Sequence, residues 1–145
     1  MKTSQLAPAE RDAIFRAAGF RKQNGGWTNC DGNGEGRLDD EWVDGGAIRD
    51  LDGDGQAEII LVDSGIACHG MTGQGYAIMA SSPAGWKSVH SNSGIPKFLA
   101  TRGAGGWQDI EVGGPGFCFP VLRWNGKEYA LLRHQYEGKP CRLPG

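Results

Sequence analysis

The feature that most constrains this chain is a run of acidic residues set directly before an apolar stretch. From Asp50 the sequence reads DLDGDGQAEIILV, with aspartates at alternate positions, then a glutamate, then aliphatic residues. Carboxylates this close together repel one another, so the run either stays open to water or closes around a cation. The aliphatic residues after it are typical of a buried strand. We therefore expect an acidic turn at the entrance to a core strand.

The spacing within the acidic run fits calcium. Numbering Asp50 as position 1 puts Asp52 at 3, Asp54 at 5, Gln56 at 7 and Glu58 at 9. Alternate side chains, a backbone carbonyl at the seventh position and an acid at the ninth can wrap oxygens around Ca²⁺ at about 2.3–2.6 Å. Mg²⁺ fits less well, because it prefers a tight octahedron that keeps several waters. We expect a structural Ca²⁺ site, and an Asp/Gly-rich turn that binds nothing is the alternative.

The run is not an EF-hand loop, because position 12 is Leu61, inside the apolar stretch, where an EF-hand has a bidentate glutamate. DLDGDGQAE followed by IILV resembles instead the D-x-D-x-D-G-x-x-D/E calcium loops of FG-GAP and VCBS-type β repeats. The resemblance covers only this loop and the strand after it. It implies a β-hairpin clipped by a metal and no particular activity.

A weaker copy of the loop lies 19 positions earlier, where DGNGEGRLDDEWVDGG matches DLDGDGQAEIILVDSG at six of 16 positions. Asp31, Asn33, Glu35 and Asp39 would then take the metal positions 1, 3, 5 and 9. Against a second site, Asp40 and Glu41 replace the apolar pair of the first loop, and a glutamate at the fifth position is longer than usual. A second, weaker Ca²⁺ site and a degenerate Gly/Asp turn both stay open.

Composition indicates a mainly β (α+β) fold. Glycine makes up 25 of 145 residues and is spread among aromatic and β-branched residues without a strict period. The one convincing helix runs from Pro8 to Ala18, with Glu10 in its first turn and Gly19 as a stop. We predict a single domain over residues 1–145, with a covering helix at 8–18 followed by an antiparallel β meander at 27–145 that includes the calcium-loop hairpin.

The strands are expected in the β-type runs at 46–49, 57–63, 75–80, 86–90, 107–112, 117–124 and 127–135. Asn125-Gly126, between the last two runs, is a strong hairpin signal, since both residues tolerate the positive φ of a type I′ turn. A two-residue turn there would pair Trp124 with Lys127 and place Cys118 opposite Arg133.

The four cysteines, Cys30, Cys68, Cys118 and Cys141, are far apart, and their even number favours two disulfides. Four cysteines allow three connectivities; we favour Cys118–Cys141 with Cys30–Cys68, because Cys141 lies only eight residues past Arg133. Disulfides imply a periplasmic or secreted protein. The start MKTSQLAPAERD has no apolar signal-peptide core. We therefore interpret Met1 as the start of a sequence that lacks its leader peptide. A cytosolic protein with reduced cysteines is the alternative.

Charge and hydropathy exclude two classes of partner. The formal net charge is −2, and Lys and Arg are scattered along the chain, so nucleic acid is not expected to bind. The longest apolar run, Ile59 to Val62, is far shorter than the ~20 residues of a membrane-spanning helix. We expect a soluble protein without a membrane span.

No catalytic set is visible in the sequence. The three histidines show no metal-ligand spacing, and a G-x-S-x-G elbow is absent. A nucleophilic pair of Cys118 with His134 is geometrically conceivable. We expect no enzyme, and a cysteine-dependent hydrolase is kept as the second alternative.

Binding is the remaining function. Aromatic anchors in glycine-rich loops are common at protein interfaces, and Trp27, Gly73, Gly105 and Trp107 are the candidates for contact with a partner. The single small domain, its calcium loop and its C-terminal half are similar in general character to the immunity proteins that protect bacteria from type VI secreted peptidoglycan amidases. That resemblance implies a secreted effector as partner, with a glycine-rich loop occluding its active-site cleft. A cell-envelope module that binds protein or glycan is the alternative, and a homodimer is compatible with either.

Overall fold

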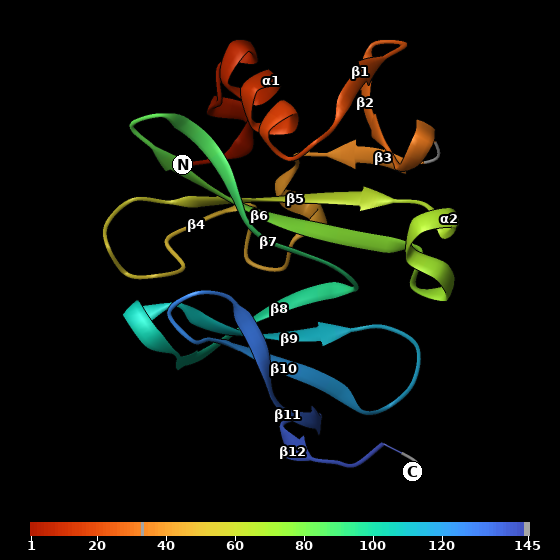
Figure 1. The fold of residues 1–145 in the computed structure, drawn as a ribbon, viewed down its shortest axis with the longest axis vertical. Helices are drawn as coiled ribbons and strands as arrows, with labels where there is room; N and C mark the ends of the chain where they lie inside the picture. Colours follow the sequence, from red (N-terminus) through yellow and green to blue (C-terminus); the bar gives the residue numbers. More distant parts are fainter. Residues whose placement is uncertain (33, 144–145) are drawn as a thin grey trace.

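A computed structural model describes residues 1–32 and 34–143 and contains two antiparallel β-sheets that follow one another along the chain (Figure 1). The first sheet has the order β1-β2-β3-β5-β6-β7, with β4 pairing to β5, and the second has the order β12-β11-β10-β9-β8. A single residue, Gly94, connects β7 to β8 and thus joins the sheets. With one N-terminal helix, this architecture confirms the predicted fold class.

The strands of the first sheet are β1 (Arg21–Gln23), β2 (Gly26–Asn29), β3 (Gly34–Arg37), β4 (Ile48–Arg49), β5 (Glu58–Ser64), β6 (Gln74–Ser82) and β7 (Gly85–Ser93). Those of the second are β8 (Ile95–Arg102), β9 (Gln108–Gly113), β10 (Phe119–Trp124), β11 (Tyr129–Tyr136) and β12 (Lys139–Pro140). The helix α1 (Pro8–Ala17) lies against β7, and α2 (Ile66–His69) is a single turn. Short 3₁₀ segments occupy Thr3–Gln5, Cys30–Gly32, Asp40–Trp42, Gly70–Thr72 and Ala104–Gly106.

The helix α1 ends as its sequence predicts. Gly19 takes a φ of +90°, which a glycine adopts at no steric penalty, and its N–H donates to the Arg16 carbonyl at 3.0 Å. The Phe20 N–H donates to the Phe15 carbonyl at 3.0 Å, and the two phenylalanine rings meet edge to face with centroids 5.5 Å apart. These bonds and this apolar contact are the parts of a Schellman C-cap, which turns the chain from α1 toward β1.

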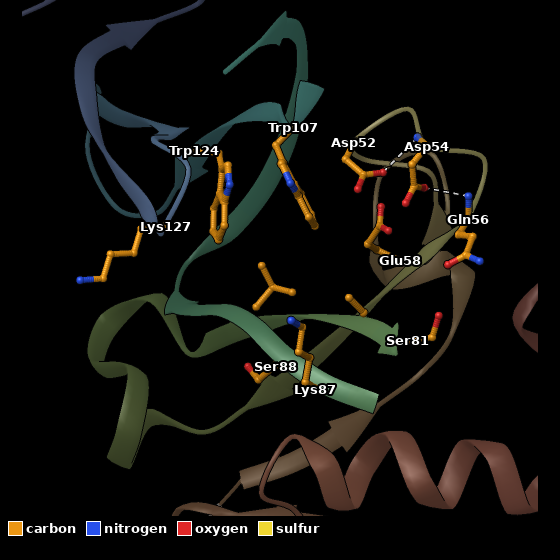
Figure 2. A pocket seen from close by; sticks show the side chains of 12 residues that line it. Asp52, Asp54, Gln56, Glu58, Ser81, Lys87, Ser88, Trp107, Trp124 and Lys127 are labelled. Carbon is orange, nitrogen blue, oxygen red and sulfur yellow. Dashed lines mark hydrogen bonds between the residues drawn. The ribbon is translucent and has the colours of Figure 1, made fainter. Parts of the chain in front are cut away.

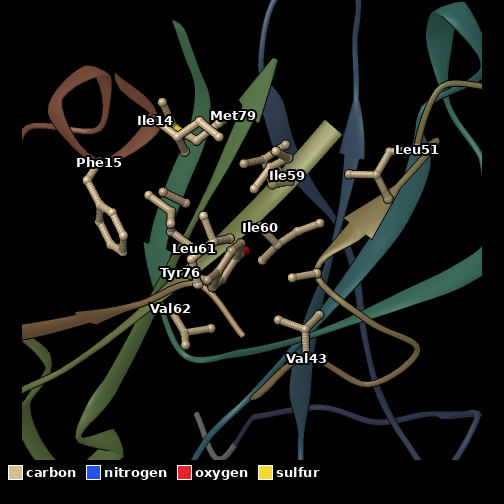
Figure 3. Packing of buried hydrophobic residues seen from close by; sticks show 14 of the residues in the cluster. Ile14, Phe15, Val43, Leu51, Ile59, Ile60, Leu61, Val62, Tyr76 and Met79 are labelled. Atoms are coloured by element: carbon tan, nitrogen blue, oxygen red, sulfur yellow. The ribbon is translucent and has the colours of Figure 1, made fainter. Parts of the chain in front are cut away.

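The core is built on both faces of β5. Every residue from Glu58 to Asp63 is buried, although successive side chains of a strand point to opposite faces. Figure 3 shows Ile14 and Phe15 of α1 on one side of β5 and Leu51 on the other. The apolar stretch after the acidic run is therefore a central strand covered on both faces, as continuous apolar strands are.

The predicted strands correspond to β4–β7 and β9–β11, and the sequence prediction missed β1–β3, β8 and β12. Strand β8 contains Pro96, which cannot donate a ladder hydrogen bond, and β8 is an edge strand that pairs only with β9, where proline is tolerated. Strand β3 reads GEGR and has almost no strand propensity. It forms because Gly36 lies against the rings of Phe15 and Phe20, where a side chain would collide with them.

The predicted two-residue turn at Asn125-Gly126 is wrong. Trp124 pairs with Tyr129, so the loop has four residues, Asn125 to Glu128. The Asn125 carboxamide oxygen accepts the N–H groups of Lys127 and Glu128, both at 2.9 Å. Because asparagine closes its own turn in this way, the longer loop is favoured over type I′. The longer loop, together with a register shift between Val121 and Leu122, places Arg133 opposite Val121 instead of Cys118.

Candidate metal centre and the adjoining pocket

The loop between β4 and β5 folds on its own carboxylates. Asp50 accepts the N–H groups of Gly53 and Gly55, both at 2.9 Å, while Asp52 and Asp54 each accept the N–H two residues further on, at 3.2 and 2.8 Å. Such Asx turns are the usual way in which aspartate stabilises a tight loop. Gly53 and Gly55 have φ values of +76° and +89°, which strain any other residue. Strands β4 and β5 flank the loop, so the predicted acidic hairpin is present.

Four carboxylates of this loop converge. One oxygen from each of Asp50, Asp52, Asp54 and Glu58 lies within 4.8 Å of the others. The first three are at or near the surface, whereas Glu58 is buried and accepts the Leu51 N–H at 2.7 Å. Gln56 lies in the same loop, and its N–H donates to Asp54. Hard oxygen ligands in this number and spacing can hold a metal ion.

The electrostatics of the cluster favour a cation. Burial, together with the charges of the neighbouring aspartates, raises the pKa of Glu58 to about 7, although the hydrogen bond from the Leu51 N–H opposes this rise. Burial also raises the pKa of Asp52, whereas the hydrogen bond from the Gly55 N–H lowers that of Asp50. A positive charge among these groups would offset both the burial and the repulsion.

The acidic loop is docked on the second sheet. The Leu51 carbonyl accepts the Gln108 N–H at 2.9 Å and an Arg102 guanidinium N–H at 3.2 Å. The same guanidinium donates to the Gly106 carbonyl at 2.7 Å. Gly106, with a φ of +87°, lies so close to the Asp52 carbonyl that a side chain there would collide with it. The conformation of the acidic loop and that of the loop before β9 are therefore linked.

A pocket of about 410 Å³ lies beside the acidic loop, between the two sheets (Figure 2). Asp52, Asp54 and Glu58 form one wall, and Trp107 and Trp124 of the second sheet form another. Lys87 of β7 lines the pocket from the first sheet and lies below both walls in Figure 2. Three chain segments that are distant in the sequence thus supply one concave site. We use the name sheet-junction pocket for this site.

The described residues of the second acidic segment form no comparable cluster. Asn33 lies outside the described residues, as does the side chain of Asp31. Glu35 is an exposed residue inside β3 that pairs with Arg37 at 3.2 Å, and Asp39 precedes the 3₁₀ segment Asp40–Trp42. Within residues 1–32 and 34–143, the Asp50 loop is the one group of acidic residues close enough to share an ion. The copy diverges because its loop part, Gly34–Arg37, forms strand β3, and its strand part contains the 3₁₀ segment Asp40–Trp42.

Both predicted disulfides are present: Cys30 bonds to Cys68 and Cys118 bonds to Cys141. No cysteine among the described residues has a free thiol. Cys118, the nucleophile that a cysteine-dependent hydrolase would need, is bonded to Cys141. Two disulfides are typical of a protein that folds in an oxidising environment outside the cytoplasm. In the described part of the chain no helix has the length and apolar character needed to cross a bilayer.

The four residues predicted to contact a partner differ in their exposure. Trp27 was expected in an exposed loop, but its ring is buried, stacks on Phe15 with centroids 5.2 Å apart and is covered by Arg16, so it belongs to the core. Gly105 is exposed in the 3₁₀ segment before Trp107, and Gly73 is half-buried at the end of another 3₁₀ segment. Trp107 is half-buried and faces the sheet-junction pocket.

The second sheet contains a buried ion pair that was not predicted from the sequence. Asp109 of β9 is fully buried and accepts two hydrogen bonds from Arg123 of β10, at 2.9 and 2.8 Å, and a third from Thr101 of β8 at 2.5 Å. Burial opposes its charge, but the hydrogen bonds from Arg123 and Thr101 outweigh it and lower the pKa of Asp109. The only sequence signal was an aspartate in a β-type run, QDIEVG, that alternates polar and apolar residues.

A second polar network surrounds His69 of α2. Its Nε2 lies 2.5 Å from an Asp63 oxygen and its Nδ1 lies 2.6 Å from the Ser93 hydroxyl, and Asn29 also donates to Asp63 at 3.1 Å. Gly75 leaves room for the imidazole, because a side chain there would collide with it. These residues line a pocket of about 380 Å³. No local motif indicated the network, because its members come from four separate elements.

No protein-family model, curated protein or solved structure gives a significant match to this chain.

Proposed function

We propose that this protein is a non-enzymatic, periplasmic or secreted binding protein whose fold is stabilised by one Ca²⁺ at the Asp50 loop. The observation that supports the proposal best is the convergence of four carboxylates in a loop that is hydrogen-bonded to the second sheet. Their repulsion opposes the folded loop, and a cation would remove it. Because Leu51 links the loop to β9, the ion would also strengthen the contact between the sheets.

Calcium is favoured over magnesium by the geometry that the loop imposes. Ca²⁺ accepts six to eight oxygens in flexible arrangements, whereas Mg²⁺ keeps several waters around a tight octahedron. A cluster of four carboxylates within nine consecutive residues supplies many protein oxygens and leaves few places for water. Extracellular calcium sites commonly have a Kd of about 10⁻⁴–10⁻³ M.

Addition of Ca²⁺ to chelated protein is expected to raise its melting temperature. An ion that binds only the folded state, present at about 100 times its Kd, stabilises that state by about 2.7 kcal/mol. Melting followed by circular dichroism in EDTA, in Ca²⁺ and in Mg²⁺ measures the shift. Asp54→Asn should remove most of it, whereas Glu41→Gln, at an exposed acid outside the loop, should retain it. A wild-type midpoint that does not respond to Ca²⁺ would rule out the structural ion.

The partner that we propose is a secreted peptidoglycan amidase, which the protein would inhibit as an immunity protein does. The exposed residues Ala104 and Gly105 of the turn before β9 support this, because backbone without large side chains can enter a narrow active-site cleft. An inhibition assay with a purified, secreted papain-like peptidoglycan amidase tests the idea. Ala104→Arg should abolish inhibition without changing the melting temperature of the protein. Glu137→Arg, on a distant turn, should inhibit the amidase as the wild type does. Full activity of the amidase with excess protein would refute the assignment.

A second candidate function, hydrolysis by a serine nucleophile, is favoured by the hydrogen-bonded series Ser93–His69–Asp63. In it, Nδ1 of His69 would accept the hydroxyl proton of Ser93, and Nε2–H would donate to Asp63. A fluorophosphonate reagent should then label Ser93 in the wild type and in Ser91→Ala, and should fail to label Ser93→Ala. Absence of labelling in the wild type, as the non-enzymatic proposal expects, would eliminate this candidate.

A further inference from the structure

The sheet-junction pocket has a rigid aromatic wall. The rings of Trp107 and Trp124 lie with centroids 5.3 Å apart, tilted by 36°. Tyr129 packs edge-on against both of them, and its hydroxyl donates to the Gln108 carbonyl at 2.8 Å. The two indoles are therefore held in place by the second sheet and are not free to collapse across the space beside them. A preformed aromatic surface binds a ligand without first losing its own conformational freedom.

The rest of the pocket is polar and of mixed charge. The carboxylates of Asp52, Asp54 and Glu58 stand across from the indoles, and Lys87 directs its ammonium group into the space (Figure 2). Hydroxyls of Ser81 and Ser88 lie on its β6 and β7 side, next to the apolar side chains of Ala80 and Val89. The volume of about 410 Å³ falls within the range of about 300–1,000 Å³ that is usual for small-ligand sites.

We propose that the sheet-junction pocket binds a saccharide, taking one N-acetylated pyranose ring against Trp107 and Trp124. A pyranose has an apolar C–H face for the indoles and hydroxyls at its edge that both donate and accept hydrogen bonds. Carboxylates accept from those hydroxyls and Lys87 donates to them, which a mixed set of charges allows. The acetyl methyl group would rest on Ala80 and Val89.

Other ligand chemistries fit the pocket less well. A small anion would meet three carboxylates, and the two lysines that line the pocket, Lys87 and Lys127, do not balance them, since Figure 2 shows the Lys127 ammonium group turned away from the space. An organic cation would compete with the metal ion for the same acidic wall. A purely apolar ligand would leave the carboxylates and Lys87 without hydrogen bonds, which is unfavourable. A neutral ligand with an apolar face and a polar edge satisfies every wall.

The saccharide site goes beyond inhibition of an amidase, because it needs no protein partner. It rests on the proposed calcium site only for the position of the acidic wall. All binding measurements are therefore made in saturating Ca²⁺, and melting curves of the same samples show whether the ion is bound. Failure of the calcium proposal then appears as an absent thermal shift, and failure of the saccharide proposal appears as absent binding to folded protein.

Titration of the ¹⁵N-labelled protein with N,N′-diacetylchitobiose tests the proposal directly. The chain has five tryptophans, so five indole N–H signals report separate places in the fold. The signals of Trp107 and Trp124 should shift saturably, while those of Trp27, Trp42 and Trp86 should stay unchanged. Lys87→Ala, at an exposed position that tolerates truncation, and Trp124→Ala should each weaken binding, the latter by at least about tenfold. Trp86→Phe, outside the pocket, should bind as the wild type does.

Three results would overturn the saccharide site. The first is the absence of any shift in the wild-type indole signals up to about 10 mM disaccharide, a concentration at which even weak, millimolar binding is visible. The second is an equal shift of all the indole signals, which indicates a solvent effect. The third is saturable binding of triglycine at Trp107 and Trp124 without binding of the disaccharide, which would assign the pocket to peptides. Because the wild-type titration decides the matter, a variant that fails to fold does not affect the outcome.

Discussion

Replacement of Asp109 by alanine is expected to lower the free energy of unfolding by about 3–5 kcal/mol, which is usual when one partner of a buried ion pair is removed. Asp109 is fully buried, and alanine would leave the donors of Arg123 and Thr101 without their acceptor. The Arg123 side chain is 38% exposed, so its charge can turn partly toward water. We therefore expect a loss near the lower end of this range.

Urea denaturation followed by tryptophan fluorescence measures this loss. Asp109→Asn should fall between wild type and alanine, because it keeps the shape and one acceptor but loses the charge. Asp12→Ala provides the matched control, since Asp12 pairs with Lys22 at 3.7 Å on the surface and such pairs contribute about 0–1 kcal/mol. Equal midpoints for Asp109→Ala and Asp12→Ala would show that the buried pair does not stabilise the second sheet.

Asp109 also bears on the sheet-junction pocket, because its partners fix the strands that carry the aromatic wall. Thr101, Asp109 and Arg123 join β8, β9 and β10. Trp107 lies directly before β9, and Trp124 is the last residue of β10. The alternation of β9 sends Asp109 and Glu111 to one face and Ile110 and Val112 to the other. A polar network thus holds one face of the sheet while an apolar face packs on the core.

The features that the sequence predicted correctly are local ones. The acidic hairpin and the helix with its glycine stop each depend on contacts between residues close in the chain, such as the hydrogen bonds from Gly53 and Gly55 to Asp50. The central strand was predicted from its own continuous apolar run. The features that it missed depend on distant contacts. Strand β3 has no propensity of its own and is fixed by the rings that cover Gly36, and β8 is fixed by its pairing with β9 in spite of Pro96.

The candidate sites follow the same division. The four carboxylates that could hold a metal ion lie within nine residues, so their spacing alone predicted the cluster. The sheet-junction pocket draws its walls from the acidic loop, from β7 and from the second sheet, and no pattern within one segment indicates that they meet. Trp27 was misassigned for a related reason: its glycine-rich neighbours suggested an exposed loop, but Phe15 lies 12 positions earlier and stacks on it.

Removal of the Cys30–Cys68 disulfide is expected to have the other large effect on stability. The bond closes a loop with a sequence separation of 38, for which the chain-entropy relation gives a stabilisation of about 4 kcal/mol. It joins the end of β2 to α2, and α2 carries His69, whose ring is hydrogen-bonded to Asp63 in the central strand β5. Loss of the bond therefore releases both the edge of the first sheet and the network around His69.

The double substitution Cys30→Ser with Cys68→Ser removes the bond without leaving a thiol that could pair wrongly, and urea denaturation in Ca²⁺ measures the change. The matched variant Cys118→Ser with Cys141→Ser breaks a bond of sequence separation 23, for which the same relation gives about 3 kcal/mol. Its effect on β5 should be small, because Cys141 follows β12 at the edge of the second sheet.

Amide hydrogen exchange separates the two cases: the first variant should lose protection in β2, β3 and β5, and the second only in β11 and β12. If both variants lost protection uniformly, the disulfides would act only on the unfolded chain, and the link from Cys68 through His69 to β5 would carry no stability of its own.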